Sequence, residues 1–152
     1  MGSGKSTVGP LLATRLGVDF LDNDTRLFDR TRRSARQIEA ADGLPALHRF
    51  EAEALLSALA GPPAVIAAAA GAVLEPDVVA ALAAQDVVYL RVPPEVAQAR
   101  VRDPADGHRP DLDAAALFEA RDPRYVELAT VVVNADQPPA AIVDDIIRAL
   151  AQ

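Results

Sequence analysis

Residues 2–7 read Gly-Ser-Gly-Lys-Ser-Thr and lead directly into an amphipathic helical pattern, and this feature most limits what the chain can fold into. Glycine lets backbone N–H groups turn toward phosphate oxygens, lysine adds positive charge, and a serine hydroxyl can bind Mg²⁺. A helix starting here also points the positive end of its dipole at the same anion. A flexible glycine-serine leader is the alternative interpretation. The pattern that follows, a helix and then a short strand that ends in aspartates, favours a phosphate-binding P-loop.

Only the second half of the P-loop signature G-x-x-x-x-G-K-[ST] is present, because its first glycine would precede Met1. The strand that normally leads into the loop lies mid-sheet. Its loss would leave neighbouring strands with unpaired backbone groups, at about 1–3 kcal/mol for each one buried. We hypothesise that Met1 is an internal loop residue and that roughly ten residues of strand and loop precede it. An intact mass of the native protein tests this.

Short apolar runs alternate with longer amphipathic segments, which predicts an α/β fold with a parallel sheet, helices on both of its faces and its central strand missing. We expect strands at 20–21, 64–68, 87–92 and 131–133. We expect helices at 7–16, 25–33, 34–41, 45–59, 76–84, 94–102, 114–128 and 139–150. Pro10 would fall in the first turn of its helix, where proline is tolerated. Residues 1–152 are predicted as one domain, with a mobile loop at about 103–113 that is rich in proline, glycine and charge.

The net charge of −7 argues against nucleic acid as a partner, since nucleic acids require a basic surface. A nucleotide needs only a local positive site and is not excluded. The chain has no cysteine, which rules out disulfides and thiolate metal sites and favours the cytoplasm. No apolar run approaches the roughly 20 residues of a membrane span, and no signal-peptide pattern is present. We therefore expect a cytoplasmic protein without a membrane partner.

An ordered set of motifs running nearly to the end of the chain resembles the shikimate kinase family. After the P-loop come Phe20-Leu21-Asp22-Asn23-Asp24, Arg33-Ser34, Ile38, Asp42-Gly43, Glu51, Gly71-Ala72-Val73, Arg109-Pro110, and Arg121 with Pro123 and Tyr125. The P-loop alone is generic, whereas this ordered set is specific. The resemblance implies a P-loop kinase in which Mg²⁺-bound ATP phosphorylates a hydroxyl group of shikimate.

The resemblance also implies a role for individual residues on the ATP side. Lys5 would hold the phosphates, and Ser6 with Asp22 would place Mg²⁺. Gln137 and Pro138 would lie near the adenine. The residues implied in nucleotide binding are Gly2, Ser3, Gly4, Lys5, Ser6, Thr7, Gln137 and Pro138.

On the acceptor side, the resemblance implies that Asp24 accepts the proton of the attacking hydroxyl. Arg109, on the mobile loop, would close over the transferring phosphoryl group. Arg121 would bind the substrate carboxylate with its guanidinium fork. Structural alternatives remain for each: Asp22 and Asp24 could cap a helix, Arg109 could be a solvated loop charge, and Arg121 could be a surface ion-pair partner. The position of the two aspartates at the carboxyl end of a strand favours a binding role.

Two departures from the family pattern fall on the acceptor side. His48 stands where the family has a carboxylate-binding arginine; histidine is shorter, lacks the fork and is mostly neutral at pH 7. The alternative interpretation is that His48 is a polar residue on the helix face with no role in binding. Arg49 is adjacent but points about 100° away around the helix. Ala69-Ala70-Gly71 replaces two of three glycines that let backbone amides approach the substrate.

Three hypotheses follow. They are a shikimate kinase, impaired or not; a related kinase for another small hydroxylated metabolite; and a non-catalytic nucleotide-binding protein. His48 and the two alanines favour the second over the first. Lys5, Ser6, Asp22 and Asp24 favour both enzymes over the third, and His48, Gly71 and Arg121 with Asp24 are the predicted acceptor-binding set.

Overall fold

The structure, a computed structural model, describes residues 2–100 and 114–152. The predicted mobile loop at 103–113, with Arg109, lies outside the described residues. The chain groups into two compact units, here named after their strands: the β3–β4 unit, from Met1–Val8 and Asp86–Gln152, and the β1–β2 unit, Gly9–Gln85. The prediction of a single domain stays a prediction. None of the described helices is long and apolar enough to cross a membrane.

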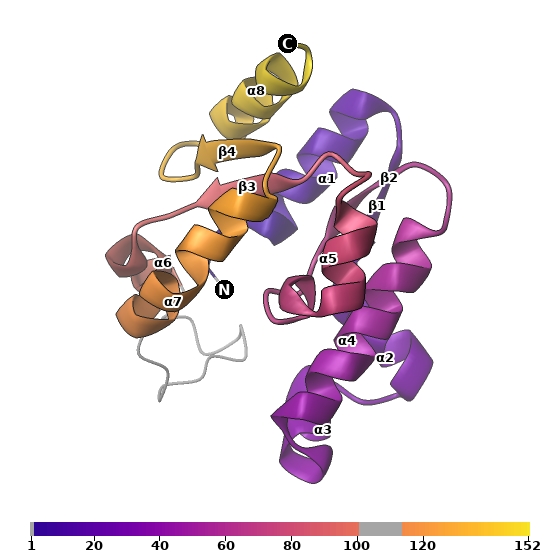
Figure 1. Ribbon diagram of the computed structural model, residues 1–152. Helices are drawn as coiled ribbons and strands as arrows, with labels where there is room; N and C mark the ends of the chain where they lie inside the picture. The colour runs from indigo at the N-terminus through magenta and orange to yellow at the C-terminus, as the bar shows by residue number, and fades with distance from the viewer. Residues whose placement is uncertain (1, 101–113) are drawn as a thin grey trace. The chain divides into compact units, whose positions relative to one another are not determined.

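The β1–β2 unit contains one pair of parallel strands and most of the helices of the first half of the chain (Figure 1). Asp19 pairs with Ala64 and Asp22 with Ala67 in the register of the two strands. The elements, the first of which begins in the other unit, are α1 (Lys5–Leu16), β1 (Asp19–Asp22), α2 (Asn23–Thr31), α3 (Ala35–Asp42), α4 (Leu44–Leu59), β2 (Ala64–Ala67), the 3₁₀ helix η1 (Ala72–Leu74) and α5 (Pro76–Leu82).

The β3–β4 unit contains the second pair of parallel strands. Val88 pairs with Val131 and Arg91 with Asn134. Its elements are β3 (Val88–Arg91), α6 (Pro94–Arg100), α7 (Ala114–Leu128), β4 (Val131–Asn134) and α8 (Pro139–Leu150). Helix α8 buries Ile142, Val143 and Ile146 next to β4.

The parallel pairing and the alternation of strands with helices confirm the predicted α/β class. The described strands form two separate two-stranded sheets rather than one continuous sheet, because no described strand is hydrogen-bonded to both pairs. The expectation that the central strand of the sheet is missing stays a prediction.

Three side chains form the core between α2, α3 and α4. Leu27, Ile38 and Leu47 are at most 3% exposed, and Ala35 and Phe50 pack against them. Helix α3 is well defined at its start, because Ser34 and Gln37 form a reciprocal capping box. Burial of these apolar side chains holds the three helices together.

A glycine allows α1 to approach β1. A β-carbon on Gly9 would collide with the ring of Phe20, so only glycine permits this packing without displacement of the ring. Both residues lie in the β1–β2 unit.

Two helix starts differ from the prediction by two residues, for local reasons. Helix α1 begins at Lys5 because the Gly4 carbonyl already accepts hydrogen bonds from Thr7 N at 3.0 Å and Val8 N at 2.8 Å. The placement of Pro10 in the first turn was therefore wrong: it lies in the second turn, where it removes the hydrogen bond that the Ser6 carbonyl would receive. Helix α2 begins at Asn23, two residues early, because Asp22 caps it.

Candidate active site

The predicted phosphate loop has the backbone that such a loop needs. Gly2 and Gly4 have φ angles of 70° and 91°, a left-handed region that glycine adopts without strain. Lys5 begins α1 and donates a hydrogen bond from Nζ to Ser3 Oγ at 3.4 Å. The loop and the first turn of α1 thus bring residues 2–7 together, with backbone amides and a lysine at a helix N-terminus. This arrangement suits an anion such as phosphate.

Arg100, at the end of α6, links this loop to the chain after β4. One guanidinium nitrogen donates to the Gly2 carbonyl at 3.4 Å and another to the Ala135 carbonyl at 2.9 Å. A further contact joins Arg100 to Asp136 at 3.8 Å. No motif marks this arginine in the sequence, because its role depends on three segments meeting in space.

The predicted adenine-side residues lie between β4 and α8. The Gln137 side-chain nitrogen donates to the Asn134 carbonyl at 2.9 Å and to Asp145 Oδ2 at 2.8 Å. Pro138 occupies the N-cap position of α8. The side-chain nitrogen of Gln137 therefore holds together the connection between β4 and α8. The side-chain carbonyl oxygen takes no part in these two bonds.

Asp22 is the N-cap of α2, so the capping alternative describes a real contact. Its Oδ1 accepts hydrogen bonds from Asp24 N at 2.9 Å and Thr25 N at 3.1 Å. Both of these hydrogen bonds reach the same carboxylate oxygen, Oδ1. Asp24 lies in the first turn of α2, where the helix dipole favours a negative charge. The cap therefore orients the Asp22 carboxylate and holds the backbone of Asp24 at the carboxyl end of β1.

Asn23, between the two aspartates, is 1% exposed and joins α2 to α4. Its Nδ2 donates to the Glu51 carbonyl at 3.2 Å. Its Oδ1 is buried without a hydrogen-bond partner among the described residues. The sequence pattern did not single out this residue as a link between helices.

His48, on α4, packs directly against Gly71. A β-carbon on Gly71 would lie 2.5 Å from His48 Nε2, and His48 Nδ1 is 4.0 Å from Glu75 Oε1. Gly71 has φ −76° and ψ −36°, which any residue adopts. Glycine is therefore needed here for space, and the ring of His48 fills that space.

Arg121 lies on α7 in the β3–β4 unit. The pKa of Tyr125, one turn further along, is raised by burial, while the charge and hydrogen bond of Arg121 act against the rise. Next to Arg121, Asp122 is bound by Tyr89 and Arg91 of β3. Burial, and then the hydrogen bond to Asp122, raises the pKa of Tyr89, and the same carboxylate raises the pKa of Arg91.

The predicted site residues divide between the two units. The P-loop, Arg121, Gln137 and Pro138 belong to the β3–β4 unit, whereas Asp22, Asp24, His48 and Gly71 belong to the β1–β2 unit. Arg109 lies outside the described residues. Within the described part of the chain, no group of three or more His, Cys, Asp or Glu side chains is placed to hold a metal ion.

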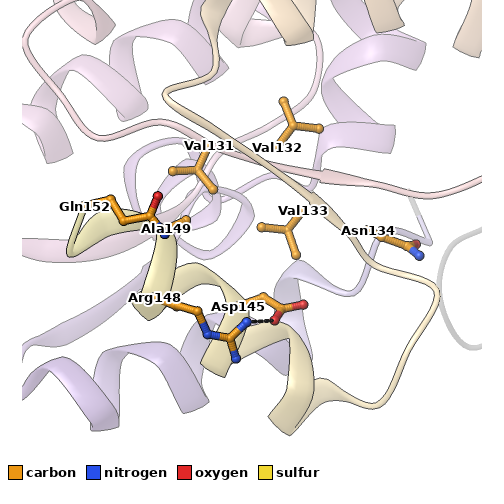
Figure 2. Close-up of a pocket in the computed structure, with 8 residues that line it drawn as sticks. All are labelled: Val131, Val132, Val133, Asn134, Asp145, Arg148, Ala149 and Gln152. Atoms are coloured by element: carbon orange, nitrogen blue, oxygen red, sulfur yellow. Dashed lines mark hydrogen bonds and ion pairs between the residues drawn. The ribbon is translucent and has the colours of Figure 1, made fainter.

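An open pocket of about 270 Å³ lies on another part of the β3–β4 unit (Figure 2). It is lined by Val131, Val132, Val133, Asn134, Asp145, Arg148, Ala149 and Gln152. Arg148 and Asp145 form an ion pair at 3.0 Å on its wall. None of the predicted site residues that the structure describes lines it.

The phosphate loop and the parallel α/β fold define a P-loop kinase of small molecules. The family described as shikimate kinase matches residues 1–151. Shikimate kinases of Nitratidesulfovibrio vulgaris and Mycobacterium tuberculosis are each 40% identical over 98% of this chain, covering 90% and 88% of those proteins. The chain belongs to the shikimate kinase family.

Solved structures agree with this assignment. Shikimate kinase from Acinetobacter baumannii in complex with shikimate has a TM-score of 0.90 at 28% identity, covering 99% of this chain and 88% of that one. Shikimate kinase from Aquifex aeolicus has a TM-score of 0.83 at 28% identity, covering 99% of this chain and 91% of that one.

Proposed function

We propose that this chain transfers the terminal phosphoryl group of ATP to a hydroxyl group of shikimate. The observation that carries the proposal is the phosphate loop, with left-handed Gly2 and Gly4 directly before Lys5 at the start of α1. Its setting in a shikimate kinase family chain supports shikimate as the acceptor. A cytoplasmic location remains a prediction from the cysteine-free composition.

On the ATP side, the loop amides and the Lys5 ammonium group would bind the β- and γ-phosphates. The residues proposed for the nucleotide are Gly2, Ser3, Gly4, Lys5, Ser6, Thr7, Gln137 and Pro138. Ser6 and Asp22 provide oxygen donors of the kind that Mg²⁺ takes, and Mg²⁺ needs only one or two protein ligands beside phosphates. When bound, the ion would neutralise charge on the phosphates.

On the acceptor side, Asp24 would take the proton from the attacking hydroxyl, since a positioned carboxylate orients the nucleophile in phosphoryl transfer. Arg109 would offset charge on the transferring group. Arg121 would bind the acceptor carboxylate through its planar fork. The cap on α2 supports the role of Asp24, because Asp22 Oδ1 fixes the backbone N–H of Asp24 at 2.9 Å.

His48 and Gly71 would complete the acceptor site. The His48 ring offers a single donor where a fork would give two, so we expect weak binding of a carboxylate. Its packing against Gly71 and its approach to Glu75 fix the ring next to an acidic side chain. This environment favours a second candidate function, phosphorylation of another small hydroxylated metabolite by the same machinery.

The test is ATP turnover by the purified protein with shikimate and with a panel of small hydroxy acids. We expect turnover with shikimate and loss of turnover in Lys5→Met. The KM for shikimate should be higher than that of a shikimate kinase with arginine in place of His48. Turnover with another hydroxy acid alone would support the second function. ATP binding without turnover of any acceptor would contradict both enzymes and indicate a nucleotide-binding protein.

A further inference from the structure

One buried carboxylate outside the predicted site is held through both of its oxygens. Asp122, in α7, is 8% exposed. Its Oδ1 accepts hydrogen bonds from the Tyr89 hydroxyl at 2.9 Å and Arg91 Nε at 2.8 Å, and its Oδ2 accepts one from Arg91 Nη2 at 2.7 Å. Both donors belong to β3. A two-pronged arginine–carboxylate pair fixes orientation more strictly than a single bond does.

Two aromatic contacts join the same strand to the same helix. The Arg91 guanidinium lies 5.8 Å from the centre of the Phe118 ring. The rings of Tyr89 and Tyr125 meet edge to face at 5.3 Å. Phe118, Asp122 and Tyr125 are spaced i, i+4 and i+7, which is one face of a helix. We call these five residues the β3 clamp.

The helix is weakened at the position that the clamp holds. Pro123 lies inside α7, and proline can neither donate the hydrogen bond to the carbonyl four residues before it nor avoid crowding that carbonyl. The backbone therefore specifies the direction of this part of α7 less firmly. Side-chain contacts to β3 must therefore help to fix the direction of this part of α7.

Arg121 directly precedes the clamped aspartate. One residue along a helix corresponds to about 100° of rotation, so the face that carries Asp122 determines where Arg121 points. Arg121 also hydrogen-bonds Tyr125, a clamp member one turn further on. The clamp thus acts on Arg121 through the backbone and through Tyr125.

We propose that Asp122 is a positioning residue for acceptor binding, which clamps α7 to β3 and so holds Arg121 in the direction needed to bind the acceptor carboxylate. The inference rests on the proposed function, in which Arg121 binds that carboxylate. Asp122 itself does not touch the reacting groups. Its loss is expected to weaken acceptor binding and to leave nucleotide binding nearly unchanged.

The first experiment compares steady-state kinetics of Asp122→Asn with the wild type. The amide keeps the shape of the side chain but loses the charge that binds Arg91. We expect the KM for shikimate to rise about five- to tenfold and the KM for ATP to stay within about twofold, since tenfold corresponds to the partial loss of one charged contact. The matched control is Glu53→Gln, an exposed carboxylate 3.6 Å from Arg30, which should change neither. An unchanged KM for shikimate, or an equal rise for both substrates, overturns the proposal.

A double variant separates positioning from general loosening. If Asp122 acts through Arg121, adding Asp122→Asn to Arg121→Ala should raise the KM for shikimate no further, because coupled residues are not additive. Two independent rises that multiply would overturn the proposal.

Amide hydrogen exchange separates this inference from the proposed function. If the wild type does not phosphorylate shikimate, the proposed function fails, and exchange in α7 decides the role of the clamp. Faster exchange at residues 118–125 in Asp122→Asn, absent in Glu53→Gln, would support clamping. Unchanged exchange in α7 would overturn it.

Discussion

The imidazole ring of His48 fills the space that a β-carbon on Gly71 would need, with Nε2 2.5 Å from that position. The glycine is retained without any unusual backbone angle, since its φ is −76°. The identity of residue 71 therefore depends on the side chain at residue 48. A larger residue at position 71 therefore requires a smaller side chain at position 48, whereas residue 48 can change while Gly71 is kept.

Gly71→Ala should destabilise the protein by about 1–3 kcal/mol, the usual range for overpacking. The removal of the ring in His48→Ala/Gly71→Ala should restore most of that loss. Urea unfolding of the single and double variants measures both effects. Gly17→Ala is the control. Any loss of stability in this variant would come from the φ of 69°, because no atom among the described residues lies within 4 Å of the added β-carbon. His48→Ala should not reduce that loss. A loss at Gly71 that persists in the double variant would contradict the packing argument.

His48→Arg should lower the KM for shikimate about tenfold, since a fork adds one charged hydrogen bond worth roughly 1.4 kcal/mol. Glu75 Oε1, 4.0 Å from His48 Nδ1, would compete for the new guanidinium. The decrease should therefore be larger in His48→Arg/Glu75→Gln. Steady-state kinetics with shikimate measure it, with Arg49→Ala as the control on the same helix. A KM that stays constant in both variants would remove residue 48 from the acceptor site.

Substitutions at Asp22 should separate its cap from its proposed metal role. Asp22→Asn keeps a good N-cap, so stability should hardly change, whereas Asp22→Ala should lose about 1 kcal/mol. Both remove the charge, so both should raise the Mg²⁺ concentration needed for half-maximal activity. Thermal unfolding and Mg²⁺ titrations of activity measure the two effects. Normal Mg²⁺ dependence in Asp22→Asn would leave the cap as the residue's one role.

Stability should fall above pH 10 because Tyr89 keeps its proton in the folded state. Burial and the bond to Asp122 raise its pKa, so above the ordinary tyrosine value of about 10 the unfolded chain binds fewer protons than the folded one. The protonated Tyr89 contributes fully to the free energy of unfolding below pH 10. This contribution is lost as the pH rises further, and the free energy of unfolding then falls by at most about 1.4 kcal/mol per pH unit. Urea unfolding between pH 8 and 11 should show a shallower fall in Tyr89→Phe. Equal slopes in the two proteins would show that Tyr89 titrates normally.

The sequence predicted the elements whose signals are local. Pro139 at the first position and a strongly amphipathic pattern placed α8 at its observed bounds, Pro139–Leu150. The starts of α1 and α2 were missed because single capping contacts, from the Gly4 carbonyl and the Asp22 side chain, determine them. Such contacts shift a boundary by two residues without altering the apolar pattern.

The site was predictable where a contiguous motif carries the chemistry, as in residues 2–7. The links made by Asn23, Arg100 and Asp122 were not, because each joins segments that are distant in sequence. Arg100 reaches Gly2 and Ala135, and Asp122 meets Arg91, which lies 31 residues away. No spacing rule within one segment reports such contacts.

Pro10 has a mechanical consequence for the phosphate-binding turn. Without its N–H, the first turn of α1, which carries Lys5 and Ser6, is joined to the rest of the helix by one hydrogen bond fewer. The helix is therefore easier to bend at this point than a regular helix would be. When a phosphate group binds to the loop, the first turn of α1 can change its tilt slightly. The remaining turns can then keep their packing against β1.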